Sequence, residues 1–307
     1  MFKIIQKRKF FFVFSGILCL VSILSLSFWG LKLGIDFTGG ALMELEFKNM
    51  ARPEVRIIRE KATNILGEVI VQETGTSAVI LKFKNIDEDT HQRFLNEFKM
   101  AVIPASSDEV KPSIEENRYE TIGPSIGREL KKKALWAIIL VNLGIIIYIG
   151  WAFRKVSKPV ASWKYGLGAI IALVHDILIT LGLFSLLGHF FGAEVDSTIL
   201  VALLTILGYS VNDTIVLYDR IRENLLRQRN EKFEETINES VNQNLSRCIN
   251  TSLTTEFVLL ALYFFGGETI KYFSLALIFG IFIGTYSSIF IASALIVEWG
   301  KVRITHN

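Results

Sequence analysis

Long hydrophobic runs, separated by short charged stretches, dominate the pattern of this chain. Three runs carry no charge at all, at 10–31, 134–153 and 272–297, and three others hold only one or two ionisable residues. A run of about 20 apolar residues is long enough for a helix to cross the hydrocarbon core of a bilayer. The pattern predicts six transmembrane helices, at 10–31, 134–153, 165–187, 197–218, 248–266 and 272–298.

The first hydrophobic run differs from a cleaved signal peptide. It is longer than the usual apolar core of such peptides, and no small-residue cleavage site follows it. We therefore expect it to remain in the protein as a membrane helix.

The basic residues predict the orientation of these helices. Sixteen lysines and arginines flank the helices on the side of the N-terminus, whereas the two short loops on the other side, 188–196 and 266–271, hold only Lys271. Basic flanks stay in the cytoplasm. Lys131–Lys133 stand on the opposite side, but they belong to a long segment, where this rule is weak. We therefore expect the N-terminus (1–9) and the C-terminal tail (299–307) both to lie in the cytoplasm.

The segment 32–133 has the patterning of a soluble domain outside the cytoplasmic membrane. Strand patterns at 41–47, 68–73, 78–83 and 119–122 alternate with helix patterns that begin at Arg52-Pro53 and at Asp87. This order predicts an extracytoplasmic α+β domain of the ferredoxin-like, split βαβ type. His91 stands alone on the second helix, and we expect it to be a solvated surface residue.

Composition excludes several classes of protein. A net charge of +3 is too small for a nucleic-acid-binding protein, so no nucleic-acid partner is expected. The two cysteines, Cys19 and Cys248, provide neither a disulfide scaffold nor a cysteine metal site. There is no HExxH sequence, phosphate-binding loop or plausible nucleophile triad, so an enzyme is not expected.

The most informative residues are the charges inside the hydrophobic runs, because such a charge costs at least about 2.5–3.5 kcal/mol at the bilayer centre. Asp213 lies in the polar sequence Gly208–Thr214, which also contains Tyr209, Asn212 and Thr214. Arg247 precedes the fifth run at the same membrane face, so the two can meet if helices four and five are neighbours. Two interpretations stay open: a proton-binding site, and a static ion pair that fixes helix packing.

The other ionisable residues in the membrane have less specific signals. We interpret the pair His175-Asp176 as a neutral histidine bonded to a neighbouring helix, with a proton relay as the alternative. Glu256 is either protonated or faces a water-filled cavity. The cytoplasmic segment 219–247 includes an amphipathic pattern with Phe233, Ile237, Val241 and Leu245 at four-residue spacing, which predicts a helix lying on the inner surface.

Glycines are concentrated where the first helix meets the first strand. Gly34, Gly39 and Gly40 provide backbone freedom there, and we interpret this segment as a hinge. Asp36, between them, is expected to turn the backbone locally.

Several of these stretches together resemble the SecF family of bacterial protein-export membrane subunits, within the RND superfamily. The resemblance extends over essentially the whole chain, in order. It rests on GIDFTGG at 34–40, IGPSIG at 122–127, His175-Asp176, GYSVNDTIVLYDRIREN at 208–224, NLSRCINTSLTT at 244–255 and GTYSS at 284–288. Glu256 departs from the family pattern, which continues there with aliphatic residues.

The resemblance implies a function and a set of partners. It implies a six-helix half of an RND-type unit in the cell inner membrane, with SecD as the obligate second half. Asp213 and Arg247 would take part in proton conduction. The proton-motive force, with no cofactor, would then drive late translocation of unfolded polypeptides. SecYEG and SecA would act earlier, and YajC and a YidC-type insertase are further expected partners. The alternative is a structural scaffold for SecD and the translocon that conducts no protons.

Overall fold

The computed structural model describes residues 1–103, 111–153, 160–227 and 232–304, without the side chains of Glu268 and 301–304. The chain divides into two compact units. The helical unit comprises Met1–Lys32 and Leu135–Asn307, and the second unit comprises Leu33–Ala134.

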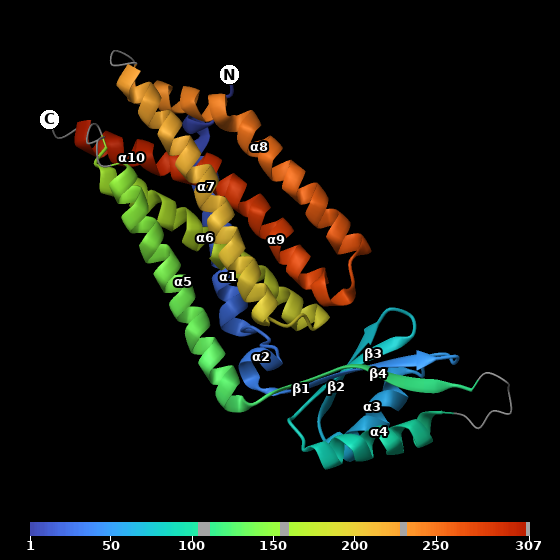
Figure 1. The fold of residues 1–307 in the computed structure, drawn as a ribbon. Coiled ribbons are helices and arrows are strands. Elements are labelled where there is room, and N and C mark those ends of the chain that lie inside the picture. Colours follow the sequence, from blue (N-terminus) through green and yellow to red (C-terminus); the bar gives the residue numbers. More distant parts are fainter. Residues whose placement is uncertain (104–110, 154–159, 228–231, 305–307) are drawn as a thin grey trace. The chain divides into compact units, whose positions relative to one another are not determined.

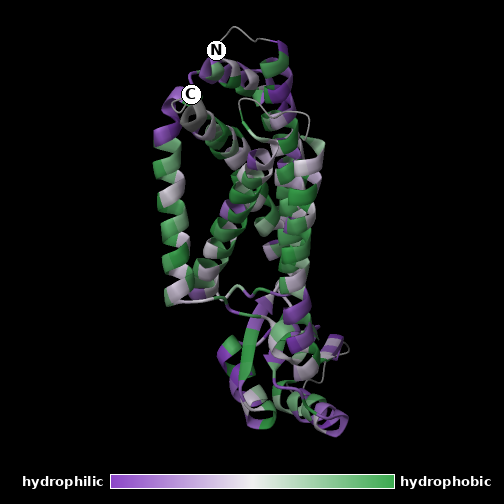
Figure 2. Ribbon diagram, turned by 90° about the vertical axis from the view of Figure 1, so that its left-hand side faces the viewer, coloured by the Kyte–Doolittle hydropathy of each residue, from purple (hydrophilic) through white to green (hydrophobic). Residues whose placement is uncertain are grey.

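The described residues include six helices that are long and apolar enough to cross a membrane, which confirms the predicted number (Figure 1). Figure 2 shows hydrophobic residues along these helices and more hydrophilic ones in the second unit. The last span, Thr269–Gly300, joins α9, a π-helical turn η2 and α10. The helices are α1 (Arg8–Phe28, after the short helix η1, Ile5–Lys7), α5 (Pro124–Ala152), α6 (Ser162–Phe191), α7 (Ser197–Arg227), α8 (Phe233–Phe265), α9 (Glu268–Ser287), η2 (Ser288–Ala292) and α10 (Ser293–Ile304).

Three helices extend well beyond the hydrophobic runs that identified them. α5 begins at Pro124, ten residues before the predicted start, because a proline is favourable in the first turn of a helix. α7 continues to Arg227. The amphipathic segment predicted to lie on the inner surface is instead the first part of α8, which is continuous with the fifth hydrophobic run. Its apolar residues Ile237 and Val241 are buried in the core of the helical unit, which explains why it does not form a separate helix.

The N-terminal segment is attached to this part of α8. The amide oxygen of Asn238 accepts hydrogen bonds from the backbone N–H groups of Ile4 and Ile5, at 3.0 and 3.1 Å. The side chain of Arg8 donates to Glu234 at 2.9 Å and to Glu298 at 2.5 Å, so one buried guanidinium joins α1, α8 and α10. Four of the basic residues that predicted the orientation, Arg154, Lys155, Lys158 and Arg229, lie outside the described residues.

The second unit contains a four-stranded antiparallel sheet in the order β2-β3-β1-β4. Each of the helices α3 and α4 follows a strand at a point where the sequence predicted a helix, and the strand order fits the split βαβ arrangement. β4 is longer than predicted. The elements are α2 (Ile35–Thr38), β1 (Gly40–Lys48), α3 (Val55–Leu66), β2 (Val69–Thr74), β3 (Ala78–Phe83), α4 (Glu88–Val102) and β4 (Ser113–Ile122).

This unit has a hydrophobic core of its own, formed by the inward-facing residues of the sheet together with apolar residues of α3 and α4 such as Ile58, Phe94 and Phe98. His91 lies beside this core, so the prediction of a solvated histidine is wrong: its side chain is only 6% exposed. Its Nε2 lies 2.9 Å from a carboxylate oxygen of Glu116, and its ring stacks on Tyr119. A hydrogen bond from Gln92, together with His91, lowers the pKa of the Glu88 carboxyl.

Candidate functional site: polar residues between the membrane helices

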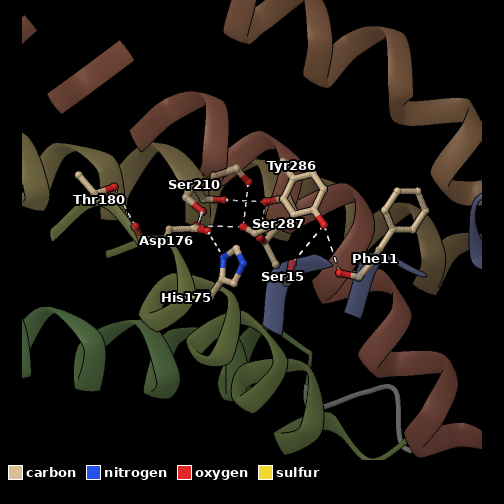
Figure 3. A network of polar contacts seen from close by, with 11 residues as sticks. Phe11, Ser15, His175, Asp176, Thr180, Ser210, Tyr286 and Ser287 are labelled. Atoms are coloured by element: carbon tan, nitrogen blue, oxygen red, sulfur yellow. Dashed lines mark hydrogen bonds and ion pairs between the residues drawn. The ribbon is translucent and has the colours of Figure 1, made fainter. Parts of the chain in front are cut away.

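The carboxyl group of Asp176 in α6 is fully buried, with no exposed surface. Its Oδ1 lies 2.9 Å from Nδ1 of His175. Its Oδ2 accepts from the hydroxyls of Ser210 in α7, at 2.6 Å, and Ser287 in α9, at 2.9 Å. Three helices therefore meet at one carboxyl group (Figure 3). His175 bonds to its neighbour in α6, and Asp176, rather than His175, makes the bonds to the adjacent helices.

Asp213 in α7 lies one turn beyond Ser210 and forms a second polar contact between helices. It is buried, and its Oδ2 accepts from the hydroxyl of Thr285 in α9 at 3.5 Å, which is a long hydrogen bond. Thr285 in turn makes a close hydrogen bond with Ser252 in α8. The carboxyl group of Asp213 is thus connected by side chains to both neighbouring helices.

Arg247 in α8 has an exposed side chain that lies within electrostatic range of Asp213. Helices α7 and α8 pack against each other, as the sequence-based interpretation required. However, no ion pair within 4 Å joins the two residues among those that the structure describes. Arg247 instead lines a cleft of about 540 Å³ between α5, α7 and α8, together with Arg220, Arg222 and the apolar side chains of Tyr148 and Phe153.

The remaining polar residues of the motif occupy different surroundings. The hydroxyl of Tyr209 donates to the backbone carbonyl of Thr251 in α8 at 2.8 Å, and that of Thr214 lies 2.7 Å from the hydroxyl of Ser288. Asn212 is exposed on the surface of α7. These contacts tie α7 to α8 and to the π-helical turn η2, and π-turns inside α-helices occur frequently at functional sites.

Glu256 is half-buried in α8, and its side chain makes no hydrogen bond or ion pair with any other described residue. No described hydrogen bond or ion pair joins its side chain to Asp213, to Asp176 or to the hydroxyl groups that bond to them. Within the described ranges, no group of three or more histidine, cysteine or acidic side chains is arranged to hold a metal ion.

The glycine motif lies in the second unit and has a specific packing role there. Gly34 is the residue before α2, which contains Asp36, and Gly39 ends that helix with φ +79° and ψ 156°. A Cβ atom on Gly39 would lie 2.9 Å from the backbone of Pro124, and one on Gly40 would lie 2.9 Å from the carbonyl oxygen of Phe83.

The second glycine-containing motif meets the first. A Cβ atom on Gly127 would lie 3.0 Å from the carbonyl oxygen of Phe37. The stretches 34–40 and 122–127 therefore pack backbone against backbone where β1 begins and where β4 leads into α5. β4 leads directly into α5, whereas α2 and the residues before it separate β1 from α1. The hinge stays a prediction.

Sequence reasoning missed the hydroxyl residues that complete both polar sites, namely Ser210, Ser252, Thr285 and Ser287. Each of them lies inside a stretch that carried the family resemblance, yet a serine in a membrane helix gives no signal of which acid it faces. Only the packing of α6, α7, α8 and α9 places these hydroxyls beside Asp176 and Asp213.

Comparisons with known proteins agree with this architecture. Residues 71–302 match the model of the family described as protein export membrane protein SecD/SecF, C-terminal, and residues 25–49 match the SecD/SecF GG motif. The chain is 42% identical over 314 residues to the protein translocase subunit SecF of Thermobaculum terrenum, covering 97% of this chain and 94% of that one. It is 43% identical to the SecF subunit of Rhodothermus marinus, covering 96% and 92% of the two chains.

Two solved structures are also similar. The crystal structure of SecDF from Thermus thermophilus, described as a translocon-associated membrane protein, matches with a TM-score of 0.79 and 34% identity. A second SecDF structure, in a super-membrane-facing form, matches with a TM-score of 0.69 and 33% identity. The alignments cover 98% and 99% of this chain, but the chain spans only 39% of each SecDF chain. By its family models, its full-length relatives and its fold, the chain belongs to the SecD/SecF family of protein-export membrane proteins, in the SecF branch.

Proposed function

We propose that this chain is one half of a proton-driven motor in the bacterial cytoplasmic membrane, and that it promotes the late stage of polypeptide export. The observation that carries the proposal is the placement of Asp213. Its carboxyl group is buried between membrane helices and has a single long hydrogen bond, from Thr285, as its described side-chain partner.

A carboxyl group in these surroundings is suited to binding and releasing a proton. Burial favours its neutral form, whereas the nearby guanidinium of Arg247 favours its charged form. A static ion pair would hold the two groups in direct contact, but they are not paired within 4 Å in the described part of the chain. This separation favours proton conduction over a pure packing role.

The environment of Arg247 also supports this role. The cleft that it lines gives its guanidinium access to one end of the helix bundle, while the carboxyl group of Asp213 is buried. A proton that moves between Asp213 and this cleft would pass the guanidinium of Arg247, which keeps its positive charge throughout. Each elementary charge that crosses a potential of 100 mV releases about 2.3 kcal/mol, which is the energy available for movement.

The orientation follows from the basic flanks, with both termini in the cytoplasm and the second unit outside the inner membrane. The work would be done by movement of that outer unit, and the glycine motifs at 34–40 and 122–127 would be its hinge. The protein would be neither an enzyme nor dependent on a cofactor, because the proton gradient supplies the energy.

SecD is the partner that this proposal requires. This chain spans 39% of the solved SecDF chain, and SecD would supply the other six-helix half. Among the six candidate membrane spans of the described residues, α5 has the smallest buried fraction, and most of its length would face lipid or SecD. SecYEG, SecA, YajC and a YidC-type insertase would be further partners on the export route.

The test is proton-driven export in membrane vesicles that contain this chain, SecD and the translocon. Asp213→Asn is expected to abolish the stimulation of export by a proton gradient. Glu235→Gln is the matched control, since it also replaces a carboxyl group of the helical unit by an amide, but Glu235 is exposed and does not line the cleft; it should preserve the stimulation. Full stimulation with Asp213→Asn would refute the proposal. Restored export with the exchanged pair, Asp213→Arg with Arg247→Asp, would support the scaffold alternative.

A further inference from the structure

The proposed function leaves the carboxyl group of Asp176 without a role, although it is more deeply buried than that of Asp213. Among the described residues, its only ion-pair partner is His175, at 2.9 Å. Burying an ionised carboxyl group without a permanent cation beside it is costly, so the charge of Asp176 depends on what His175 and the neighbouring hydroxyls provide.

His175 does not supply that permanent cation. Its Nδ1 faces Oδ1 of Asp176, but its Nε2 is buried and has no hydrogen-bond partner among the described residues. A protonated imidazole would place an unbonded N–H group of a cation in this buried position. The ring of Tyr286 is stacked 6.3 Å from the imidazole, between ring centroids. The neutral form, with its hydrogen on Nδ1, fits the contacts better and still donates to Asp176.

The hydroxyl of Ser287 allows Asp176 to change its charge while every hydrogen-bond donor between the two side chains keeps an acceptor. This hydroxyl has one hydrogen but two acceptors within reach, Oδ2 of Asp176 at 2.9 Å and the carbonyl oxygen of Gly284 at 3.1 Å. When Asp176 is ionised, Ser287 donates to the carboxylate. When Asp176 carries a proton on Oδ2, the carboxyl group donates to Ser287, and Ser287 donates to Gly284.

The other groups around the site are compatible with both states. The hydroxyl of Ser210 donates to Oδ2, and a carboxylic oxygen can accept that bond whether or not it also holds a proton. The remaining titratable groups that face the site are the thiol of Cys19 in α1, within electrostatic range of Asp176, and the phenol of Tyr286 in α9. Asp213 lies one turn further along α7, bonded to Thr285 instead.

We propose that Asp176, positioned by His175 and Ser287, is a second proton-binding site of this protein, separate from Asp213. This inference rests on the proposed proton-driven function. One proton forms an O–H bond with Oδ2 when it binds, and the same bond breaks when it leaves; no group is oxidised or reduced. Binding reverses the direction of the hydrogen bond between α6 and α9 and completes a bond within α9, next to the π-helical turn.

The packing of α9 links this event to helix position. Gly284 lies so close to α7 that a Cβ atom on it would be 2.8 Å from Cβ of Ser210, and it would be 3.5 Å from Oδ2 of Asp176. A change in the hydrogen bond between Ser287 and Asp176 therefore acts at a close contact of α6, α7 and α9. The second site would couple proton binding to the packing of these three helices.

The experiment is an infrared pH titration of the full chain with SecD in lipid nanodiscs, in which the C=O band of protonated carboxyl groups is followed. The expected result is a titrating band that is present in the wild type and in Asp213→Asn but absent in Asp176→Asn. If Asp176→Asn leaves every titrating band in place, the second site is refuted.

Ser287→Ala keeps the carboxyl group and covers the case in which Asp176→Asn does not fold. It should shift the midpoint of the Asp176 band by about one pH unit, or a tenfold change in proton affinity, because the bond that Ser287 gives to the carboxylate is stronger than the bond that it accepts from the protonated carboxyl group, and both are lost. The control is Ser185→Ala, which removes a buried hydroxyl of α6 that bonds to the Ser25 carbonyl at 2.9 Å, away from any carboxyl group. An unchanged midpoint in Ser287→Ala, or an equal shift in Ser185→Ala, would contradict the proposal.

The two proposals fail in different ways. If a proton gradient does not stimulate export by the wild type, the proposed function fails. If the gradient stimulates export and Asp213→Asn abolishes this effect, but no band belongs to Asp176, only the second site is lost.

Discussion

Replacing Gly39 by alanine tests the packing of the two glycine motifs. Gly39 has φ +79° and ψ 156°, a combination that is essentially restricted to glycine. The added Cβ atom would lie 2.9 Å from Cα and 3.0 Å from N of Pro124, and neither backbone atom can rotate away. Gly39→Ala therefore combines backbone strain with a steric clash between the two motifs.

The two effects can be estimated separately. A non-glycine residue in such a backbone conformation costs about 1–3 kcal/mol. Inserting a methyl group into a packed contact costs about 1–3 kcal/mol more. Gly67 is the matched control, because it also has a positive φ, +78°, but a Cβ atom added to it would meet no other atom within 4 Å. Gly67→Ala should show the backbone cost alone.

Hydrogen exchange of the full chain in detergent, followed by mass spectrometry, measures both variants. Peptides that cover β1 and β4 report the opening of the sheet of the second unit. A further loss of about 1–3 kcal/mol should make these amides exchange about 5–150 times faster in Gly39→Ala than in Gly67→Ala. Equal exchange rates in the two variants would show that the motifs do not pack against each other as described.

Two further predictions concern each unit separately. In the helical unit, Gly182→Ala should lower the stability measured by thermal unfolding by about 1–3 kcal/mol, because the new Cβ atom would lie 2.7 Å from Cα of Ser22 and push α1 away from α6. Gly144→Ala is the control and should not lower the stability, because a Cβ atom there would meet no other atom within 4 Å. In the second unit, the carboxyl group of Asp87 accepts a hydrogen bond from the N–H of Thr90 at the start of α4. Hydrogen bonding from Thr90 lowers the pKa of the Asp87 carboxyl group. The stabilisation by Asp87 is thus present above its ordinary pKa of about 3.9 and is lost as the pH falls through the lower, folded-state value. In urea unfolding, the stability difference between wild type and Asp87→Ala should be constant at neutral pH and shrink below about pH 4; a difference that persists unchanged at lower pH would contradict this.

Hydropathy predicted the number of membrane helices because a charge in the bilayer is costly, so a span must appear as a run with few charges. Hydropathy does not detect the polar residues by which a membrane helix continues beyond the bilayer. For this reason the prediction placed the start of the fifth helix at 248, although α8 begins at Phe233. The spacing of Ile237 and Val241 correctly indicated a helix, but only tertiary packing makes it continuous with the membrane span.

The candidate site was only partly predictable for a related reason. An acidic residue in a hydrophobic run is conspicuous, so Asp176 and Asp213 were identified from the sequence alone. Their partners are hydroxyl groups on other helices, and serine and threonine are too common in such helices to be informative. His91 illustrates the same limit in the second unit, since its burial depends on Glu116 and Tyr119 of a strand distant in the sequence.

The most direct test of the central claim is proton flux itself, measured with a pH-sensitive dye inside proteoliposomes that contain this chain, SecD and the translocon during export. The account predicts proton movement that accompanies export in the wild type and in Glu235→Gln and that is absent in Asp213→Asn. Proton movement in Asp213→Asn equal to that of the wild type would contradict the account.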